Sequence, residues 1–167
     1  MQRGSAGFTL LEMLMVLAIL GVLAAFAFPS FGYLSANTKV KSASTEIYLA
    51  MIRARSESVK RNRTVGVIAT SGNKDTWESG WSLVADGNND GDFTDAEPTD
   101  RVISTQNAMS AVSIKMAAAN VVFRPNGRIS GAAPQFDVKP TDAKQVTVQR
   151  CVSTDVTGRP FIKTKAC

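Results

Sequence analysis

Gly7-Phe8-Thr9-Leu10-Leu11-Glu12, followed by the apolar run Met13–Phe28 and by Pro29, is the stretch that decides the fold. Between Phe8 and Phe28 only Glu12 carries a charge. As a helix this run would be about 31 Å long, close to the hydrocarbon thickness of about 30 Å of a bilayer. We therefore predict that residues 8–29 cross a membrane once.

A short polar segment, residues 1–7, precedes the run and contains one cation, Arg3. The basic end of a membrane segment stays in the cytoplasm, so the C-terminal bulk is expected on the other side. After the run the chain reads Phe26-Ala27-Phe28-Pro29-Ser30-Phe31, which is a poor match to the A-x-A cleavage signal. Cleavage before the run is the better interpretation.

The order Gly7, Phe8, Thr-Leu-Leu-Glu and a long apolar helix resembles the N-terminal segment of type IV pilins and type II secretion pseudopilins. The resemblance implies that a prepilin peptidase cuts after Gly7 and N-methylates Phe8. It also implies that Glu12 neutralises the N-terminal amine of a neighbouring subunit during assembly. Cleavage would in addition place the Phe8 amine about one helical turn from Glu12, which offsets the cost of a carboxylate in the bilayer. A plain single-pass anchor with one tolerated acid is the alternative.

The composition argues against catalysis. The chain has no histidine and two cysteines, so the commonest general base and the usual zinc ligand sets are absent from the sequence. It contains no nucleophile motif of the G-x-S-x-G or S-x-x-K type. The net charge of +5 permits an anionic partner without requiring one. We expect a structural protein and not an enzyme.

Cys151 and Cys167 lie sixteen positions apart in a chain that we expect to be exported, and they predict one disulfide. Closing that loop would stabilise the fold by roughly 3 kcal/mol in the chain-entropy model. The spacing is not C-x-x-C, so a redox pair is not expected. Two buried free thiols are disfavoured, because the last residue of a chain is hard to bury.

Residues 30–63 predict an amphipathic helix that continues the first one after a kink at Pro29. Its apolar stripe follows steps of three and four residues and is expected to pack on a globular head. The stripe consists of Val40, Ala43, Ile47, Met51 and Ala54, with Tyr48, Ile52 and Val59 alongside. The other face is basic: Lys39, Lys41, Arg53, Arg55, Lys60, Arg61 and Arg63, against Glu46 and Glu57.

Residues 64–167 are rich in β-branched residues and turn signals, which predicts an antiparallel β-sheet head. The fold class is therefore α+β, and the resemblance makes it a type IV pilin-like fold. The expected organisation is a leader at 1–7, a membrane or filament-core half-helix at 8–29, a half-helix packed on the head at 30–63, and the head at 64–167. Expected strands are 64–69, 80–85, 101–105, 112–116, 121–124, 135–139, 146–151 and 159–164.

The head also resembles FimT/FimU minor pilins and GspH pseudopilins. The matching stretches are Ala54–Asn62, Trp77–Trp81, Val122–Arg128 and Gly158–Pro160. The resemblance implies a minor type IV pilin that primes pilus assembly and sits at or near the tip, with a GspH-like pseudopilin as the alternative. It implies partners among minor pilins and the major pilin, and a single-pass position in the bacterial inner membrane, with the head in the periplasm, before assembly into a pilus or pseudopilus.

One acidic segment fits the calcium-loop pattern D-x-[DN]-x-[DN]-G-x5-E. The candidate Ca²⁺ ligands are Asp86, Asn88, Asp90, Asp92 and Glu97. The segment follows a predicted strand instead of a helix, and turns rich in Asp, Asn and Gly form without a metal. An acidic turn is therefore the alternative to a calcium site.

The basic C-terminal segment raises the possibility of DNA binding. The candidate residues are Arg150, Arg159, Lys163 and Lys165. Basic side chains neutralise phosphates, and Phe161 could stack on a base. Some FimT-like minor pilins bind DNA through a Gly-Arg-x-Arg motif, of which Gly158 and Arg159 match while Phe161 replaces the second arginine. A last strand with solvent-facing lysines is the favoured alternative.

Overall fold

The computed structural model describes residues 8–95, 99–142, 144 and 148–167, and the side chains of residues 25–30 lie outside the description. The chain divides into two compact units, Met1–Ser35 and Ala36–Cys167. A single helix, α1 (Leu10–Arg61), belongs to both, so the helix expected on either side of Pro29 is continuous. Among the described residues, no helix is long and apolar enough to span a bilayer.

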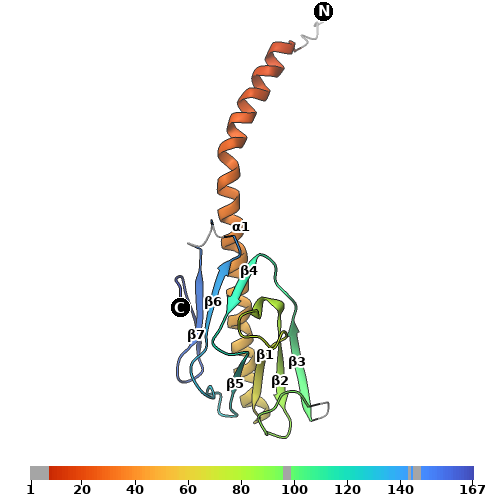
Figure 1. Ribbon diagram of the computed structural model, residues 1–167, viewed down its shortest axis with the longest axis vertical. Coiled ribbons are helices and arrows are strands. Elements are labelled where there is room, and N and C mark those ends of the chain that lie inside the picture. The colour runs from red at the N-terminus through yellow and green to blue at the C-terminus, as the bar shows by residue number, and fades with distance from the viewer. Residues whose placement is uncertain (1–7, 96–98, 143, 145–147) are drawn as a thin grey trace, which may run out of the picture. The chain divides into compact units, whose positions relative to one another are not determined.

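The second unit contains two antiparallel four-stranded sheets (Figure 1). The first has the order β3-β2-β1-β5 and consists of β1 (Val65–Ala69), β2 (Trp81–Asp86), β3 (Asp100–Gln106) and β5 (Asn120–Phe123). The second has the order β4-β6-β7-β8 and consists of β4 (Val112–Lys115), β6 (Gln135–Pro140), β7 (Arg150–Thr154) and β8 (Pro160–Lys163). The α+β class is confirmed, and the predicted β-sheet head proves to be two sheets.

The strand expected at 146–151 is displaced, because β7 runs from Arg150 to Thr154. Its register is fixed by pairing with both neighbours, since Val152 lies opposite Phe136 of β6 and Ile162 of β8. Phe136 and Val152 are fully buried, so this register places their apolar side chains in the core. Residues 145–147, where the prediction began the strand, lie outside the described residues.

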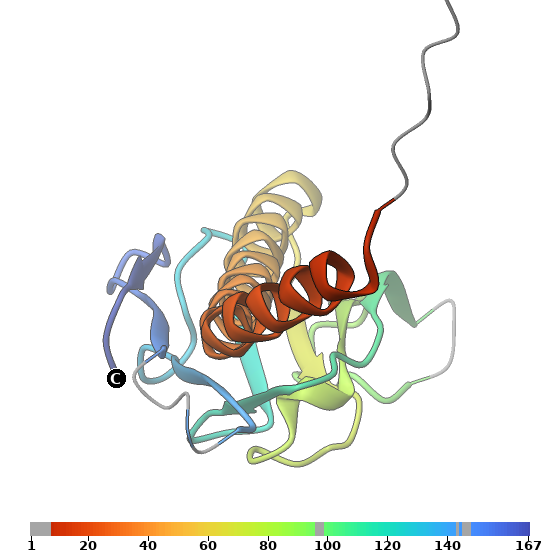
Figure 2. The same ribbon diagram turned by 90° about the horizontal axis from the view of Figure 1, so that it is seen from above.

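One hydrophobic core joins the C-terminal part of α1 to both sheets, and Figure 2 shows this part of α1 beside them. The predicted stripe is confirmed: Val40, Ala43, Ile47, Met51 and Ala54 are all buried. Two residues expected to lie alongside the stripe are exposed instead: Ile52 is 40% exposed and Val59 is 55% exposed. The periodicity places both residues near the stripe, but the sheets do not extend far enough around the helix to cover them.

A short 3-10 helix, η1 (Trp77–Ser79), lies between β1 and β2 in the chain and contacts β4 of the second sheet. The Trp77 indole is fully buried, donates from Nε1 to the Ala118 carbonyl at 3.0 Å, and meets the Phe136 ring edge-to-face at 4.9 Å. The carboxylate of Glu78 accepts a hydrogen bond from the Ile114 N–H of β4 at 2.9 Å. Segment 77–79 therefore holds β4, the edge strand of the second sheet, against the core of the second unit.

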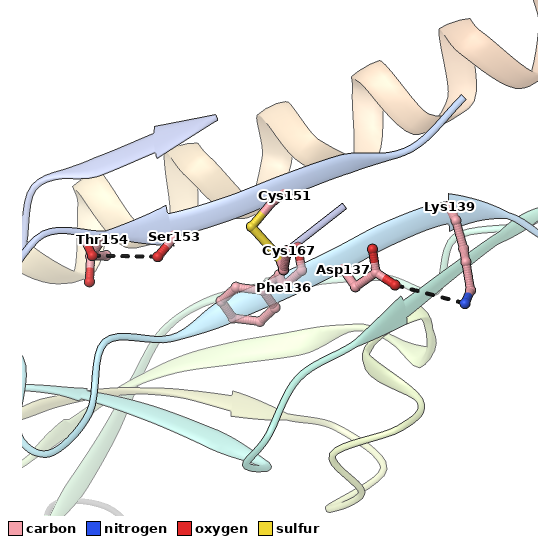
Figure 3. The surroundings of a disulfide bond; sticks show 7 residues. All are labelled: Phe136, Asp137, Lys139, Cys151, Ser153, Thr154 and Cys167. Carbon is pink, nitrogen blue, oxygen red and sulfur yellow. Dashed lines mark hydrogen bonds and ion pairs between the residues drawn. A yellow bond between two sulfur atoms is a disulfide. The ribbon is translucent and has the colours of Figure 1, made fainter. Parts of the chain in front are cut away.

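The predicted disulfide between Cys151 and Cys167 is present, with their Cα atoms 4.9 Å apart. Figure 3 shows it on β7, next to Phe136 of β6, and Cys167 Sγ lies 3.3 Å from the Phe136 carbonyl oxygen. Cys151 lies opposite Lys163 of β8 and alternates with the core residue Val152. The bond therefore holds the C-terminal residues against the outer face of the second sheet.

Candidate functional site

Thr9 and Glu12 form a reciprocal cap at the start of α1. The Glu12 carboxylate accepts hydrogen bonds from the Thr9 N–H at 2.9 Å and the Thr9 hydroxyl at 3.0 Å, while the Glu12 N–H donates to Thr9 Oγ1 at 3.2 Å. This is a capping box, which satisfies donors that an α-helix leaves unpaired at its first turn. The Glu12 carboxylate is therefore held in place at the N-terminus of α1, where the helix dipole favours a negative charge.

Of the two predicted processing residues, Gly7 and Phe8, the structure describes only Phe8. Gly7 lies outside the described residues, and Phe8 has an 81% exposed side chain. Thr9 is the functional candidate that the sequence reasoning missed. Its signal was readable, because Thr9-Leu10-Leu11-Glu12 fits the S/T-x-x-E pattern of a capping box before an apolar run.

The acidic loop, residues 86–95, is organised by its own carboxylates. Asp86 is fully buried and accepts hydrogen bonds from the N–H groups of Asn89 and Gly91. Asp100 is buried as well, and it accepts from the N–H of Asp95 at 3.0 Å. These bonds supply the turn with the acceptors that it needs, in the manner of Asx turns.

The calcium hypothesis gains no preformed site from this loop. Among the described residues, no group of three or more acidic, histidine or cysteine side chains is placed to hold a metal ion. Asp86, its first candidate ligand, uses both carboxylate oxygens for backbone N–H groups. Glu97, its last, lies outside the described residues, so the complete ligand set stays a prediction.

The four cations proposed for DNA binding belong to different segments of the second unit. Lys163 lies opposite Cys151 on the outer face of the second sheet, with its Nζ 5.0 Å from the centroid of the Phe161 ring. Arg159 lies instead in the turn before β8, beside α1. Lys165 belongs to the exposed residues after β8, whereas Arg150 begins β7.

Arg159 lines a groove between α1 and β8. The groove has a volume of about 770 Å³ and continues along β8 into a hollow of about 540 Å³. Tyr48, Ile52 and Val59 of α1 supply apolar surface, together with Pro160. An adjoining hollow of about 340 Å³ is lined by further cations. We call the surface formed by these cations the cationic groove; it consists of Arg55, Lys60, Arg124, Arg128 and Arg159.

Two glycine turns make this arrangement possible. Gly158 has φ +82°, and a Cβ there would collide with the Gly127 carbonyl oxygen. Gly127 has φ +75°, and a Cβ there would meet Val59 Cγ2 at 3.0 Å and Arg55 Nε at 3.3 Å. Because neither glycine has a side chain, the Gly158 turn packs closely against the Gly127 turn, and the Gly127 turn packs closely against the end of α1. Three stretches that are distant in the sequence thereby form one surface.

Asp155 holds the turn between β7 and β8. Its Oδ1 accepts from the Thr157 hydroxyl at 2.6 Å and from the N–H groups of Thr157 and Arg159 at 2.8 and 2.9 Å. The Thr157 hydroxyl above all, then these N–H groups, and also the charge of Arg55, hold the pKa of Asp155 below its usual value. An ionised Asp155 is therefore part of the folded turn.

Protonating Asp155 should destabilise the second unit. A carboxylate with a lowered pKa in the folded state contributes stability that is full above its unfolded pKa and is lost as the pH falls through the folded pKa. We expect Asp155→Asn to lower the melting temperature at pH 7 and to reduce its fall in acid. Asp155→Ala should lower the melting temperature further, because the acceptor is also lost. Melts between pH 7 and pH 2 test this, and parallel curves for Asp155→Asn and the parent would contradict it.

The chain matches two protein families. The family described as type II transport protein GspH matches residues 43–158, which include the first sheet, three of the four strands of the second sheet and most of the packed part of α1. The chain belongs to the GspH family. The family described as prokaryotic N-terminal methylation motif matches residues 2–28. No curated protein matches the chain.

Solved structures of a minor pilin and of a minor pseudopilin share this fold. The type IV minor pilin FimU of Pseudomonas aeruginosa strain PAO1 matches with a TM-score of 0.63 and 19% identity over 78% of this chain and 93% of that one. The minor pseudopilin EpsH of Vibrio cholerae matches with a TM-score of 0.55 and 11% identity over 75% of this chain and 97% of that one. The type IV pilin-like fold is thereby confirmed.

Proposed function

We propose that this chain is a structural subunit of a bacterial filament, a minor type IV pilin that primes assembly and sits at or near the tip. The observation that carries the proposal is that two family matches each include part of α1. The methylation motif matches residues 2–28, and the GspH family matches residues 43–158. The first match supports a processed N-terminus, which such subunits use for assembly. The second match supports a head of the minor pilin and pseudopilin kind.

Before assembly the chain would sit in the bacterial inner membrane, with its head in the periplasm. This part of the proposal is supported by the run Phe8–Phe28, in which Glu12 is the one charged residue. A prepilin peptidase would cut after Gly7 and methylate Phe8. The capped carboxylate of Glu12 would then be available to the amine of a neighbouring subunit, which makes other minor pilins and the major pilin the expected partners.

A pseudopilin of a type II secretion machine is the second candidate. It is favoured by the family description, type II transport protein, and by the similarity of fold to EpsH. The two candidates differ in the filament that contains the subunit. They share the leader, the cleavage and the role of Glu12.

Mass spectrometry of the mature chain tests the shared part of the proposal, with an N-methylated Phe8 as the expected first residue. Gly7→Val should leave the leader attached. A mature chain that begins anywhere else would contradict the pilin function. Deleting the gene in its host separates the two candidates: loss of surface pili with secretion intact identifies a minor pilin, and loss of secretion with pili intact identifies a pseudopilin.

A further inference from the structure

The strand β8 lies at the end of its sheet and leaves one side of its backbone open. The second sheet has the order β4-β6-β7-β8, so among the described residues β8 pairs with β7 alone. The Asp155 N–H donates to the Arg159 carbonyl at 3.0 Å, and the hydrogen-bonded pairs of an antiparallel ladder recur at every second residue. Phe161 and Lys163 therefore bond to β7, whereas the N–H and the carbonyl of Ile162 point away from it. Such an open edge can pair with another extended segment.

A second apolar stripe of α1 lies beside this open edge. Tyr48, Ile52 and Val59 follow one another at steps of four and seven residues, and together with Pro160 and Ile162 they line the groove between α1 and β8. Ile52 and Val59 are exposed, because the sheets do not reach them. From Tyr48 to Val59 the helix rises about 16 Å, which is the length of about five extended residues. The groove is therefore long enough to hold one short strand next to β8.

The groove between α1 and β8 is also positively charged. Three members of the cationic groove, Arg55, Lys60 and Arg159, line it, and neither arginine forms an ion pair among the described residues. Lys60 pairs with Glu57 at 3.8 Å, but its side chain is 73% exposed, which makes this bond weak. Asp155 lies on the same surface, where its Oδ1 accepts hydrogen bonds from its own turn. The described part of the chain therefore compensates these cations only in part.

These three properties together describe one kind of ligand. An extended segment that adds to a sheet edge gains main-chain hydrogen bonds, while its alternate side chains provide specificity. Its apolar side chains would cover Tyr48 and Ile52, and its carboxylates would meet Arg55, Lys60 and Arg159. A nucleic-acid duplex would meet the same cations, but it would leave the open edge and the apolar stripe uncovered.

We propose that the groove between α1 and β8 binds an extended acidic segment of a different pilin subunit, which adds to β8 as a further strand of the second sheet. The inference rests on the proposed function, because that function makes other pilins the partners of this chain. The cations steer the acidic segment into the groove. The open backbone of Ile162 then fixes its register beside β8.

Peptide binding by the full chain in detergent micelles tests the site. The probes are twelve-residue peptides that tile the heads of the other pilins and pseudopilins of the host. Peptides of this chain and a short DNA duplex are compared with them. We expect the chain to bind pilin peptides in which carboxylates accompany alternating apolar residues. The affinity of the tightest peptide, measured by fluorescence anisotropy, should fall with rising salt, because exposed ion pairs are screened.

The substitution Ile162→Pro tests the strand edge. Proline removes an N–H that points away from β7, and it is tolerated on edge strands. The tightest peptide should bind about tenfold more weakly, because one of its carbonyl groups loses a donor. Ile162→Val keeps the N–H and is the matched control, with an affinity within about twofold of the parent. Melting temperatures of both variants show whether the second unit stays folded.

A charge reversal tests the cations and decides the matter even where Ile162→Pro does not fold. Lys60→Glu with Arg159→Glu changes two exposed cations and should weaken the acidic peptide about tenfold. A peptide with lysine at its acidic positions should bind the reversed chain and not the parent, and a misfolded variant cannot be rescued in this way. Arg53→Glu with Arg101→Glu, two exposed cations that do not line the groove, gives the same change in net charge and should leave the affinity unchanged.

Three results would overturn the inference: no binding of any acidic pilin peptide, binding confined to peptides of this chain or to the DNA duplex, or an affinity that ignores the charge reversal and shows no rescue. Methylation of Phe8 and the amount of the chain in sheared filaments are measured in parallel. A chain that is processed and enters filaments, but binds no acidic pilin peptide, would contradict the groove contact and leave the proposed function in place. A chain without methylated Phe8 would contradict the proposed function.

Discussion

Glu12→Ala is expected to leave a processed chain that hardly enters filaments. Without the carboxylate, the methylated amine of Phe8 would enter an apolar helix bundle unpaired, at a cost of about 2.5–3.5 kcal/mol on insertion scales. A cost of that size corresponds to a loss of more than about tenfold in incorporation. The measurement is the ratio of the chain in sheared filaments to the chain in membranes, read by quantitative immunoblot.

Glu12→Gln separates the two roles of this side chain. The amide keeps an oxygen that can accept from the Thr9 N–H and hydroxyl, so the cap of α1 survives, but the negative charge is lost. We expect Glu12→Gln to fail in assembly nearly as badly as Glu12→Ala, whereas Thr9→Ser, which keeps a hydroxyl, should assemble normally. Full incorporation of Glu12→Gln would contradict a charge role and leave Glu12 as a helix cap.

Trp77→Ala is expected to cause the largest loss of stability in the second unit. Trp77 is fully buried between the sheets, where it contacts the Phe136 ring and donates to the Ala118 carbonyl. Removing a buried tryptophan costs about 3–5 kcal/mol, from lost burial and from the cavity that remains. The melting temperature should fall by about 10 °C or more.

Chemical denaturation of residues 36–167 measures this loss as a free energy of unfolding. Trp77→Phe should cost less than Trp77→Ala, because a ring still fills much of the site although the Ala118 carbonyl loses its donor. Val156→Ala, at a side chain that is 76% exposed, is the matched control and should change stability by less than about 0.5 kcal/mol. Equal losses of unfolding free energy for Trp77→Ala and Val156→Ala would contradict the burial of Trp77 against Phe136 and Ala118.

Some features of the molecule followed from local sequence alone. The apolar run with Glu12 as its single charge, and the capping box that Thr9 forms with it, are defined within one or two helical turns. The buried stripe of α1 follows from a repeat of 3.6 residues, and most strands could be placed from β-branched runs between turn residues. These signals are readable because each depends on neighbours in the sequence.

The tertiary structure decided what depends on contacts between distant segments. Pairing partners split the predicted head into two sheets and moved β7 to Arg150–Thr154, since a register is set by the strands on either side. The structure adds that buried Asp86, a candidate metal ligand, accepts hydrogen bonds from two N–H groups of its own loop. The exposure of Ile52 and Val59 depends on where the sheets end.

The sequence by itself therefore determined the long helix and the α+β class, because each depends on residues that are close along the chain. The tertiary structure alone decided which cations lie close together. Arg55, Arg124 and Arg159 are separated by at least 35 positions in the sequence. They meet in one surface because Gly127 and Gly158 have no side chains to keep the two turns from each other and from α1, and such a close approach leaves no periodic pattern to read.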